Sequence, residues 1–457
     1  MGGGRHQLFL LNRMDPRLRV LAPQLIRRLS DGPLPRRAHM RATSANVVPP
    51  ARLRVGFADG FEGEFHAMWL LDNCPSRRSA SNQKARTSAE LPEDAGLAGA
   101  AAVHGGEQVR VDWTGSAPSS TFDAAWLHRH AYGPPPAPDA AARALASAPS
   151  ARAPIPRLSF DEVCTSDAAL YRWLGHLADE GFCVLEGAPD DDEAGCRAAE
   201  RIAPVMATIY GRAWDVVDSP DAINVAYTSV ALPLHMDLAY YESPPGLQLL
   251  HCRCFDAQVT GGESVLLDSF EAAKLFSVRH PREFELLARV PATFVKEHFA
   301  RERPVVMRYR RPHFALNGSG ELTGIFWAPP FDGPLCAPLE DVGPYYAAYR
   351  CFDAFLTGLV ETRGWTFRLC AGEVVTFNNR RLLHGRTSFE ANGGTRALRG
   401  CYVSIDEFAS RLAVLDRTHG APPGARQPEM GLPMLGNQDH ANGLPLPSRK
   451  PAEGPPL

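Results

Sequence analysis

The 457-residue sequence has almost no lysine, no long apolar run and no excess of charge of one sign. No stretch approaches the roughly 18 uninterrupted apolar residues of a membrane-spanning helix, which excludes a transmembrane protein. Because 48 Lys+Arg nearly balance 51 Asp+Glu, no global positive field favours nucleic acid or an anionic membrane. With 45% hydrophobic residues the chain can build a sizeable core, which excludes fibrous and disordered proteins.

Paired cysteines are also missing, because the 10 Cys are scattered and form no CxxC motif. In a chain of this length the pattern favours reduced thiols packed as small apolar residues. Arginine, in contrast, crowds the first 41 residues, where acids are rare and Leu21, Leu25 and Leu29 can form an apolar helical stripe. Such a segment is typical of an organelle transit peptide, here mitochondrial, and the open alternative is an Arg-rich leader of a cytoplasmic protein.

The composition predicts five segments along the chain. Residues 1–50 form the leader, 51–132 a small β-rich domain, 133–157 a Pro/Ala-rich linker, 158–412 the main domain and 413–457 a disordered Pro/Gly-rich tail. Alternating apolar residues predict strands at 53–57 and 109–113, and the Ser-, Ala- and Gly-rich residues 76–106 predict a loose loop.

In the main domain a capped helix precedes a series of strands. Ser166 or Asp167 caps a helix whose apolar residues Leu170, Trp173, Leu174 and Leu177 share one face. Gly181 ends this helix, and strand-like runs follow at 182–185, 246–252, 264–267, 374–377 and 400–405, with a helix at 270–276. Strands without regular βαβ alternation favour a sandwich or barrel over a doubly wound sheet.

His235 and Asp237 stand two residues apart on an extended segment, so both side chains project to one face. They could supply two ligands to a divalent metal, although a His-x-Asp pair alone more often marks a hydrogen-bonded His at a strand end. His384 follows a later strand, and Arg396 lies 12 residues beyond it. Two His and one carboxylate suit non-haem iron(II) oxygenases, and the Arg could clamp a dicarboxylate cosubstrate. The combination favours the metal interpretation.

Six stretches in the right order resemble one family. They are Trp69-Leu70-Leu71-Asp72-Asn73-Cys74-Pro75, Tyr210-Gly211-Arg212-Ala213-Trp214, Asn224-Val225-Ala226-Tyr227-Thr228, residues 245–252, residues 260–262 and residues 381–386. The chain resembles the γ-butyrobetaine and trimethyllysine dioxygenases of the taurine-dioxygenase-like superfamily from about Leu53 to Arg411. The resemblance implies a mainly β fold with flanking helices, in which a double-stranded β-helix (jelly roll) follows a small β-rich N-terminal domain.

The resemblance also assigns roles to residues. His235, Asp237 and His384 become the iron ligands, and Arg396 with Ser264 would hold the distal carboxylate of 2-oxoglutarate. A strand Ser is otherwise most simply a hydroxyl bonded to the neighbouring backbone.

An aromatic cage for a trimethylammonium group is implied at four further positions. Because this cation donates no hydrogen bond, it is best held by aromatic faces, and the cage residues would be Tyr210, Trp214, Tyr227 and Tyr402. Tyr210 and Trp214 are four apart, which predicts one helical turn. Asn224 matches butyrobetaine enzymes, whereas trimethyllysine enzymes have an acid there.

Two departures from the family pattern stand out. The family's structural zinc uses three Cys and one His, but only Cys74 remains here, with Ser76 and Ser79 at the next ligand positions. We therefore expect no structural zinc. The family's Asn-rich pocket stretch falls at residues 325–330, which are apolar here, so the native substrate could be another quaternary ammonium acid.

The implied activity is hydroxylation of a trimethylammonium carboxylic acid, most simply γ-butyrobetaine to L-carnitine, coupled to conversion of 2-oxoglutarate and O2 into succinate and CO2. Ascorbate would keep the iron reduced, and relatives suggest a homodimer. Two alternatives remain open: a hydroxylase of trimethyllysine or another betaine, and a non-catalytic binding protein that retains the fold.

Overall fold

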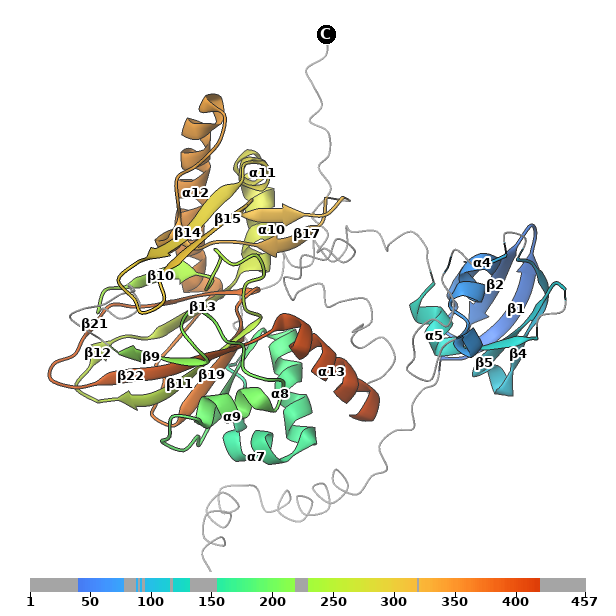
Figure 1. Ribbon diagram of the computed structural model, residues 1–457, viewed down its shortest axis with the longest axis horizontal. Helices are drawn as coiled ribbons and strands as arrows, with labels where there is room; N and C mark the ends of the chain where they lie inside the picture. Colours follow the sequence, from blue (N-terminus) through green and yellow to red (C-terminus); the bar gives the residue numbers. More distant parts are fainter. Residues whose placement is uncertain are drawn as a thin grey trace, which may run out of the picture. The chain divides into compact units, whose positions relative to one another are not determined.

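The computed structural model describes residues 40–77, 88, 91–92, 95–115, 118–131, 154–217, 229–318 and 320–419. Contacts divide the chain into two compact units, Met1–Gly133 and Pro134–Leu457, both drawn in Figure 1. Within the described ranges, no helix combines the length and apolarity needed to cross a membrane.

The N-terminal unit consists of two antiparallel three-stranded sheets and short helices. One sheet contains β1 (Ala42–Val48), β2 (Arg52–Phe57) and β3 (Glu62–His66), and the other contains β4 (Leu97–Val103), β5 (Gln108–Trp113) and β6 (Ser120–Asp123). Two helices, α4 (Ala67–Asp72) and α5 (Ala124–Arg129), follow β3 and β6. Alternate apolar residues such as Leu53, Val55, Val109 and Val111 are fully buried and form its core.

Two predictions for this unit were wrong. The leader was expected to reach residue 50, but β1 begins at Ala42 and pairs with β2 along its length. The expected loop 76–106 contains β4, which pairs with β5. Its sequence, LAGAAAV, carries no β-branched residue until its last position, so the strand is held by backbone hydrogen bonds that side-chain patterning does not reveal.

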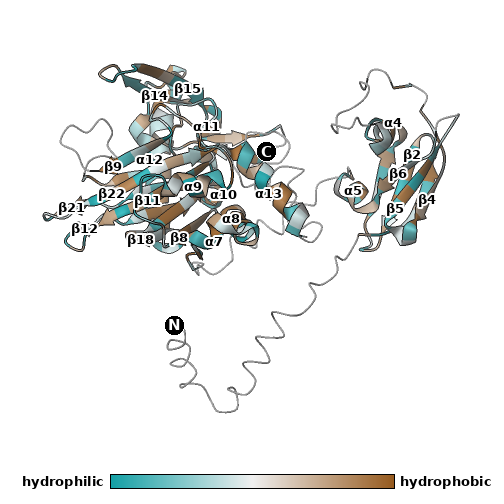
Figure 2. Cartoon of the chain, turned by 60° about the horizontal axis from the view of Figure 1, so that its bottom comes forward, coloured by the Kyte–Doolittle hydropathy of each residue, from teal (hydrophilic) through white to brown (hydrophobic). Residues whose placement is uncertain are grey.

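A six-stranded sheet forms one layer of the C-terminal unit. In spatial order it contains β7 (Arg157–Ser159), β8 (Phe182–Glu186), β19 (Glu373–Asn378), β11 (Leu247–Phe255), β22 (Arg396–Val403) and β9 (Ala213–Val217). Four helices contribute to the core on one face of this sheet: α7 (Phe160–Thr165), α8 (Asp167–Asp179), α9 (Ala194–Glu200) and α13 (Ile405–His419). In Figure 2 hydrophobic and hydrophilic residues alternate along α13, as expected of a helix with one buried side.

A four-stranded sheet contributes the second layer, in the order β10 (Leu232–His235), β20 (Leu382–Arg386), β13 (Ser264–Asp268) and β18 (Trp365–Phe367). The order brings strands far apart in sequence together in two layers, as in a jelly roll. The predicted mainly β catalytic domain with flanking helices is thereby confirmed at the level of fold class.

A third group of elements packs around a further core at one end of the sheets. It contains the helices α10 (Ser269–Arg279), α11 (Pro281–Arg289) and α12 (Leu339–Arg363), and the strands β14 (Ala292–His298), β15 (Val305–Arg311), β16 (Phe314–Leu316) and β17 (Leu322–Ile325). The remaining pair is β12 (Thr260–Gly261) with β21 (Phe389–Glu390).

The predicted helix near residue 170 is confirmed as α8. The Ser166 hydroxyl accepts from the backbone N–H of Ala169, and Gly181 follows with a φ of +87°. The domain end was placed too early, because α13 runs to His419 rather than ending at residue 412. Leu412 and Leu415 are buried in the core that α13 shares with α8, so the apolar helical face continues beyond the predicted boundary.

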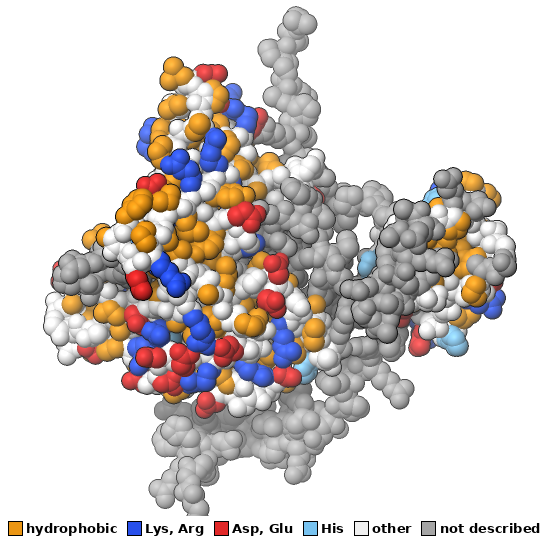
Figure 3. Space-filling model, viewed as in Figure 1, with side chains coloured by type: hydrophobic (Ala, Val, Ile, Leu, Met, Phe, Trp, Pro, Cys, Tyr) orange, Lys and Arg blue, Asp and Glu red, His pale blue; other side chains and the backbone are white. Residues whose placement is uncertain are grey.

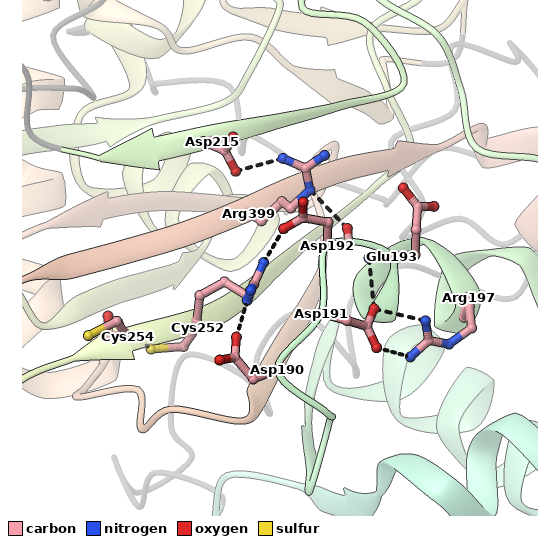
Figure 4. Close-up of polar contacts among 10 residues, drawn as sticks. Asp190, Asp191, Asp192, Glu193, Arg197, Asp215, Cys252, Cys254 and Arg399 are labelled. Carbon is pink, nitrogen blue, oxygen red and sulfur yellow. Dashed lines mark hydrogen bonds and ion pairs between the residues drawn. The ribbon is translucent and has the colours of Figure 1, made fainter.

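An ion-pair network ties the acidic loop 190–193 to the outer face of the six-stranded sheet (Figure 4). Arg253 of β11 contacts Asp190 and Asp192, and Arg399 of β22 contacts Asp215 of β9 at 2.7 Å. Side chains of both signs gather over this part of the unit (Figure 3). Because alternate residues of β22 face opposite ways, Arg399 is neutralised on this outer face while Arg396 faces the space between the sheets.

Candidate active site

Three potential metal ligands meet between the two sheets. His235 ends β10, Asp237 lies in the turn that follows, and His384 lies in β20, directly opposite His235 in the antiparallel register. Each offers one ligand atom, and these atoms lie within 4.8 Å of one another. The Nε2 atoms of His235 and His384 are 3.4 and 3.8 Å from the two carboxylate oxygens of Asp237. In the described ranges this is the only such cluster, and its donor set suits iron(II).

Local interactions prepare the three side chains for a metal. His235 Nδ1 lies 2.9 Å from the carbonyl oxygen of Pro233 and must donate to it, which leaves the lone pair on Nε2 free for a metal. Burial lowers the pKa of His384 to about 3, assisted by the neighbouring His235, so the ring is neutral at physiological pH. Burial opposes ionisation of Asp237, but the contacts of its carboxylate with the His235 and His384 rings and with the Tyr402 hydroxyl outweigh it and hold the pKa of Asp237 below its usual range.

Asp237 is held from two further directions. The Tyr402 hydroxyl donates to its carboxylate at 2.6 Å. The Asn379 carboxamide accepts from the Asp237 backbone N–H at 2.8 Å and donates to the Asp237 carbonyl at 3.1 Å. Sequence reasoning assigned no role to Asn379. The Asn pair directly after a buried strand was its one signal, because a short amide there can bond to a neighbouring backbone.

The ligands open into a cavity of about 650 Å³ of empty space, part of which is open to solvent. Arg396 and Ser264 line one end of it. Arg396 is 6% exposed, and its Nε has no hydrogen-bond partner in the part of the chain that the structure describes. Burial lowers its pKa to about 10, assisted by the charge of Arg386, so the group remains a cation that can bind a carboxylate.

The glycine pair at residues 261–262 lets the Arg396 side chain lie close against the backbone of Gly262. Gly262 has a φ of +78°, and a Cβ built on it would lie 3.1 Å from Arg396 Nε. Any larger residue would crowd the guanidinium and strain the backbone.

Aromatic rings line the other end of the cavity. The rings of Trp214 and Tyr402 stack at 4.2 Å, and those of Tyr210 and Trp214 lie 6.2 Å apart. The predicted helical turn between Tyr210 and Trp214 was wrong. Thr208 and Gly211 form a tight bridge with Gly211 at a φ of +93°, after which β9 begins at Ala213. A turn followed by a strand therefore brings the two rings together.

Other predicted positions do not reach the cavity or cannot be placed. Asn224, Tyr227 and Ser79 lie outside the described residues. Phe326, Trp327 and Ala328, from the stretch that replaces the family's Asn-rich segment, are buried in the core beside α12 and do not line the cavity. The amide chemistry of that segment is therefore absent from the described cavity wall.

In the N-terminal unit, hydroxyl groups surround Cys74. Its Sγ lies 3.0 Å from Ser76 Oγ and 3.1 Å from Ser120 Oγ, and Trp113 donates to Ser120 at 2.8 Å. One thiol among serine hydroxyls does not fit a zinc site, which requires four nitrogen or sulfur ligands. The absence of a structural zinc stays a prediction.

Comparison with known proteins gives the same assignment as the geometry. Residues 142–402, more than half of the chain, match the family described as "Taurine catabolism dioxygenase TauD, TfdA family". The chain belongs to this family. Residues 49–128 match the family described as "Gamma-butyrobetaine hydroxylase-like, N-terminal". The protein is thus a dioxygenase of the kind that uses iron(II) and 2-oxoglutarate, and the His235/Asp237/His384 cluster fits that metal.

Relatives match across both units. The chain is 34% identical to the gamma-butyrobetaine dioxygenase of Pseudomonas sp. (strain AK-1), over 79% of this chain and 93% of that protein. It is 31% identical to the gamma-butyrobetaine dioxygenase of Homo sapiens, over 79% and 94%. It is 27% identical to the trimethyllysine dioxygenase of Meyerozyma guilliermondii, over 78% and 92%. The predicted family is confirmed.

Proposed function

We propose that the protein hydroxylates a trimethylammonium carboxylic acid, and that the substrate is γ-butyrobetaine, with L-carnitine as product. The observation that carries the proposal is one cavity with three chemically distinct walls. Aromatic rings line one end, a buried arginine the other, and the His235/Asp237/His384 cluster lies between them. Relatives named for γ-butyrobetaine and trimethyllysine at 27–34% identity support this substrate class.

Bound iron(II) with 2-oxoglutarate and O2 supplies the oxidising chemistry, which converts the cosubstrate into succinate and CO2. The protein supplies placement. Arg396 pairs with the distal carboxylate of the cosubstrate, with Ser264 as a second contact. Tyr210, Trp214 and Tyr402 hold the cation so that one C–H group faces the metal. Ascorbate as reductant, a homodimeric state and mitochondrial import of the Arg-rich leader remain further proposals.

A succinate assay over a panel of acids tests the function. The full-length protein with iron(II) and 2-oxoglutarate should form succinate with γ-butyrobetaine faster than with trimethyllysine or shorter betaines. Faster turnover of trimethyllysine would make the protein a sister hydroxylase. No substrate-dependent succinate from folded, iron-loaded protein would refute both and favour a binding protein. A His235→Ala variant should bind no iron(II).

A further inference from the structure

Besides the metal ligands, the arginine end and the aromatic rings, the described wall of the cavity contains one carboxamide, that of Gln248 of β11. It is 3% exposed, and its Oε1 has no hydrogen-bond partner in the described part of the chain. A buried amide oxygen without a partner destabilises the ligand-free protein, because the oxygen loses its hydrogen bonds to water on folding and gains none in exchange. A ligand that places positive charge beside this oxygen would provide a favourable electrostatic interaction in place of the lost hydrogen bonds.

The strand register places Gln248 at the cation end of the cavity. Gln248 lies directly opposite Tyr402 in the antiparallel pairing of β11 with β22, so the two Cβ atoms are about 5 Å apart on one face. Arg396 lies six residues before Tyr402 in β22 and pairs with Phe255 of β11. At roughly 3.3 Å per residue, about 20 Å of strand separates the Gln248 position from Arg396. The cosubstrate held by Arg396 therefore has its anchor far from Gln248.

The chemistry of an amide oxygen fits a trimethylammonium group and not a carboxylate. The methyl groups of this cation carry much of its positive charge and form C–H···O contacts with an acceptor. The oxygen is part of a neutral group, so it attracts the cation without the desolvation cost of a buried carboxylate. A substrate carboxylate in the same place would meet the negative end of the dipole.

We propose that Gln248 is a substrate-binding residue whose amide oxygen completes the aromatic cage and contacts the trimethylammonium group. The inference rests on the proposed function, because it requires a quaternary ammonium substrate. The Gln248 amide adds a dipole to the wall formed by Trp214 and Tyr402, and this dipole distinguishes a cation from a neutral group of the same shape.

The test compares a cationic substrate with its neutral carbon isostere, in which a tert-butyl group replaces trimethylammonium. The binding of both acids to protein loaded with iron(II) and 2-oxoglutarate is measured by calorimetry without O2. Gln248→Met keeps the side-chain length and removes the dipole, and we expect it to weaken binding of the cationic acid about fivefold. The affinity for the neutral isostere should change by less than about twofold. The matched control Leu250→Met alters the next residue on the same face of β11 and should leave the ratio of the two affinities unchanged.

A second readout needs no ligand. Replacing an unpaired buried amide by an apolar group of similar shape is neutral or stabilising, so Gln248→Met should not lower the thermal unfolding midpoint of the protein. A lowered midpoint with equal weakening of both acids would show a structural residue and overturn the inference. If the wild-type protein binds the cationic acid more tightly than the neutral one and Gln248→Met keeps the same ratio of affinities, the inference about Gln248 is also overturned, while the proposed function stands. A wild-type protein without any preference for the cation would refute both.

Discussion

Gly400→Ala should damage the aromatic cage without touching a metal ligand. Gly400 of β22 pairs with Trp214 of β9, and the Trp ring lies over the glycine. A Cβ added at Gly400 would lie 2.5 Å from Cζ2 and 2.6 Å from Cε2 of this ring, closer than real Cβ atoms approach other atoms. The ring must move, and it then loses its stacking on Tyr402 at 4.2 Å.

The size of the effect follows from the lost contact. One aromatic face on a desolvated cation contributes about 1–2 kcal/mol, so the KM for the trimethylammonium substrate should rise about 5- to 30-fold. The strain should also lower the free energy of unfolding by about 1–3 kcal/mol. The succinate assay measures the first and urea unfolding the second, while the KM for 2-oxoglutarate should remain near the wild-type value.

Gly358→Ala is the matched control, because it adds the same methyl group inside α12, where no described atom beyond the chain neighbours and the backbone of the helix itself lies within 4 Å of the new Cβ. It should leave both KM values unchanged and raise the free energy of unfolding slightly, since Ala has a higher helix propensity than Gly. An unchanged KM for the ammonium substrate in Gly400→Ala would refute the assignment of Trp214 to the cage.

Three further predictions test the rest of the structure. Arg396→Met should raise the KM for 2-oxoglutarate at least about tenfold with little effect on the KM for the ammonium substrate, and equal losses in both would contradict the assignment of Arg396 to the cosubstrate. Asp268→Ala breaks a buried pair with Arg381 at 2.9 Å and removes the N-cap of α10, so it should cost about 3–5 kcal/mol in urea unfolding. Glu162→Ala, in an exposed pair with Arg172, should cost less than about 1 kcal/mol, and similar losses would show that burial does not matter here. Burial lowers the pKa of His313 to about 4 in the folded protein, so the unfolded chain binds an extra proton between that pH and about 6.5. Stability should fall by about 3 kcal/mol from this group as the pH drops through that window, and His313→Gln should show a flatter profile than the wild type in urea titrations.

The local pattern of the sequence predicted those features that depend on neighbouring residues. The helix after Ser166 needed only a cap and a 3.6-residue apolar repeat, and both are present in α8. His235 and Asp237 project together because they are two apart on an extended segment. Residue type and order along the chain then suggested that His384 and Arg396 belong to the same site, and the resemblance to a family assigned each of them a role. Strand β4 escaped prediction because Gly and Ala carry no periodic signal, although their backbones pair as well as any others.

Tertiary structure alone decided what surrounds these residues. Only the packing of β9 on β22 shows that Gly400 lies beneath Trp214, and only the register of β11 on β22 sets Gln248 beside Tyr402. Asn379 reaches the Asp237 backbone across 142 residues of sequence. Such contacts depend on how separate strands align, and alignment is set by the packing of whole sheets. The amino-acid sequence therefore determined the chemical groups of the site, and the fold determined their neighbours.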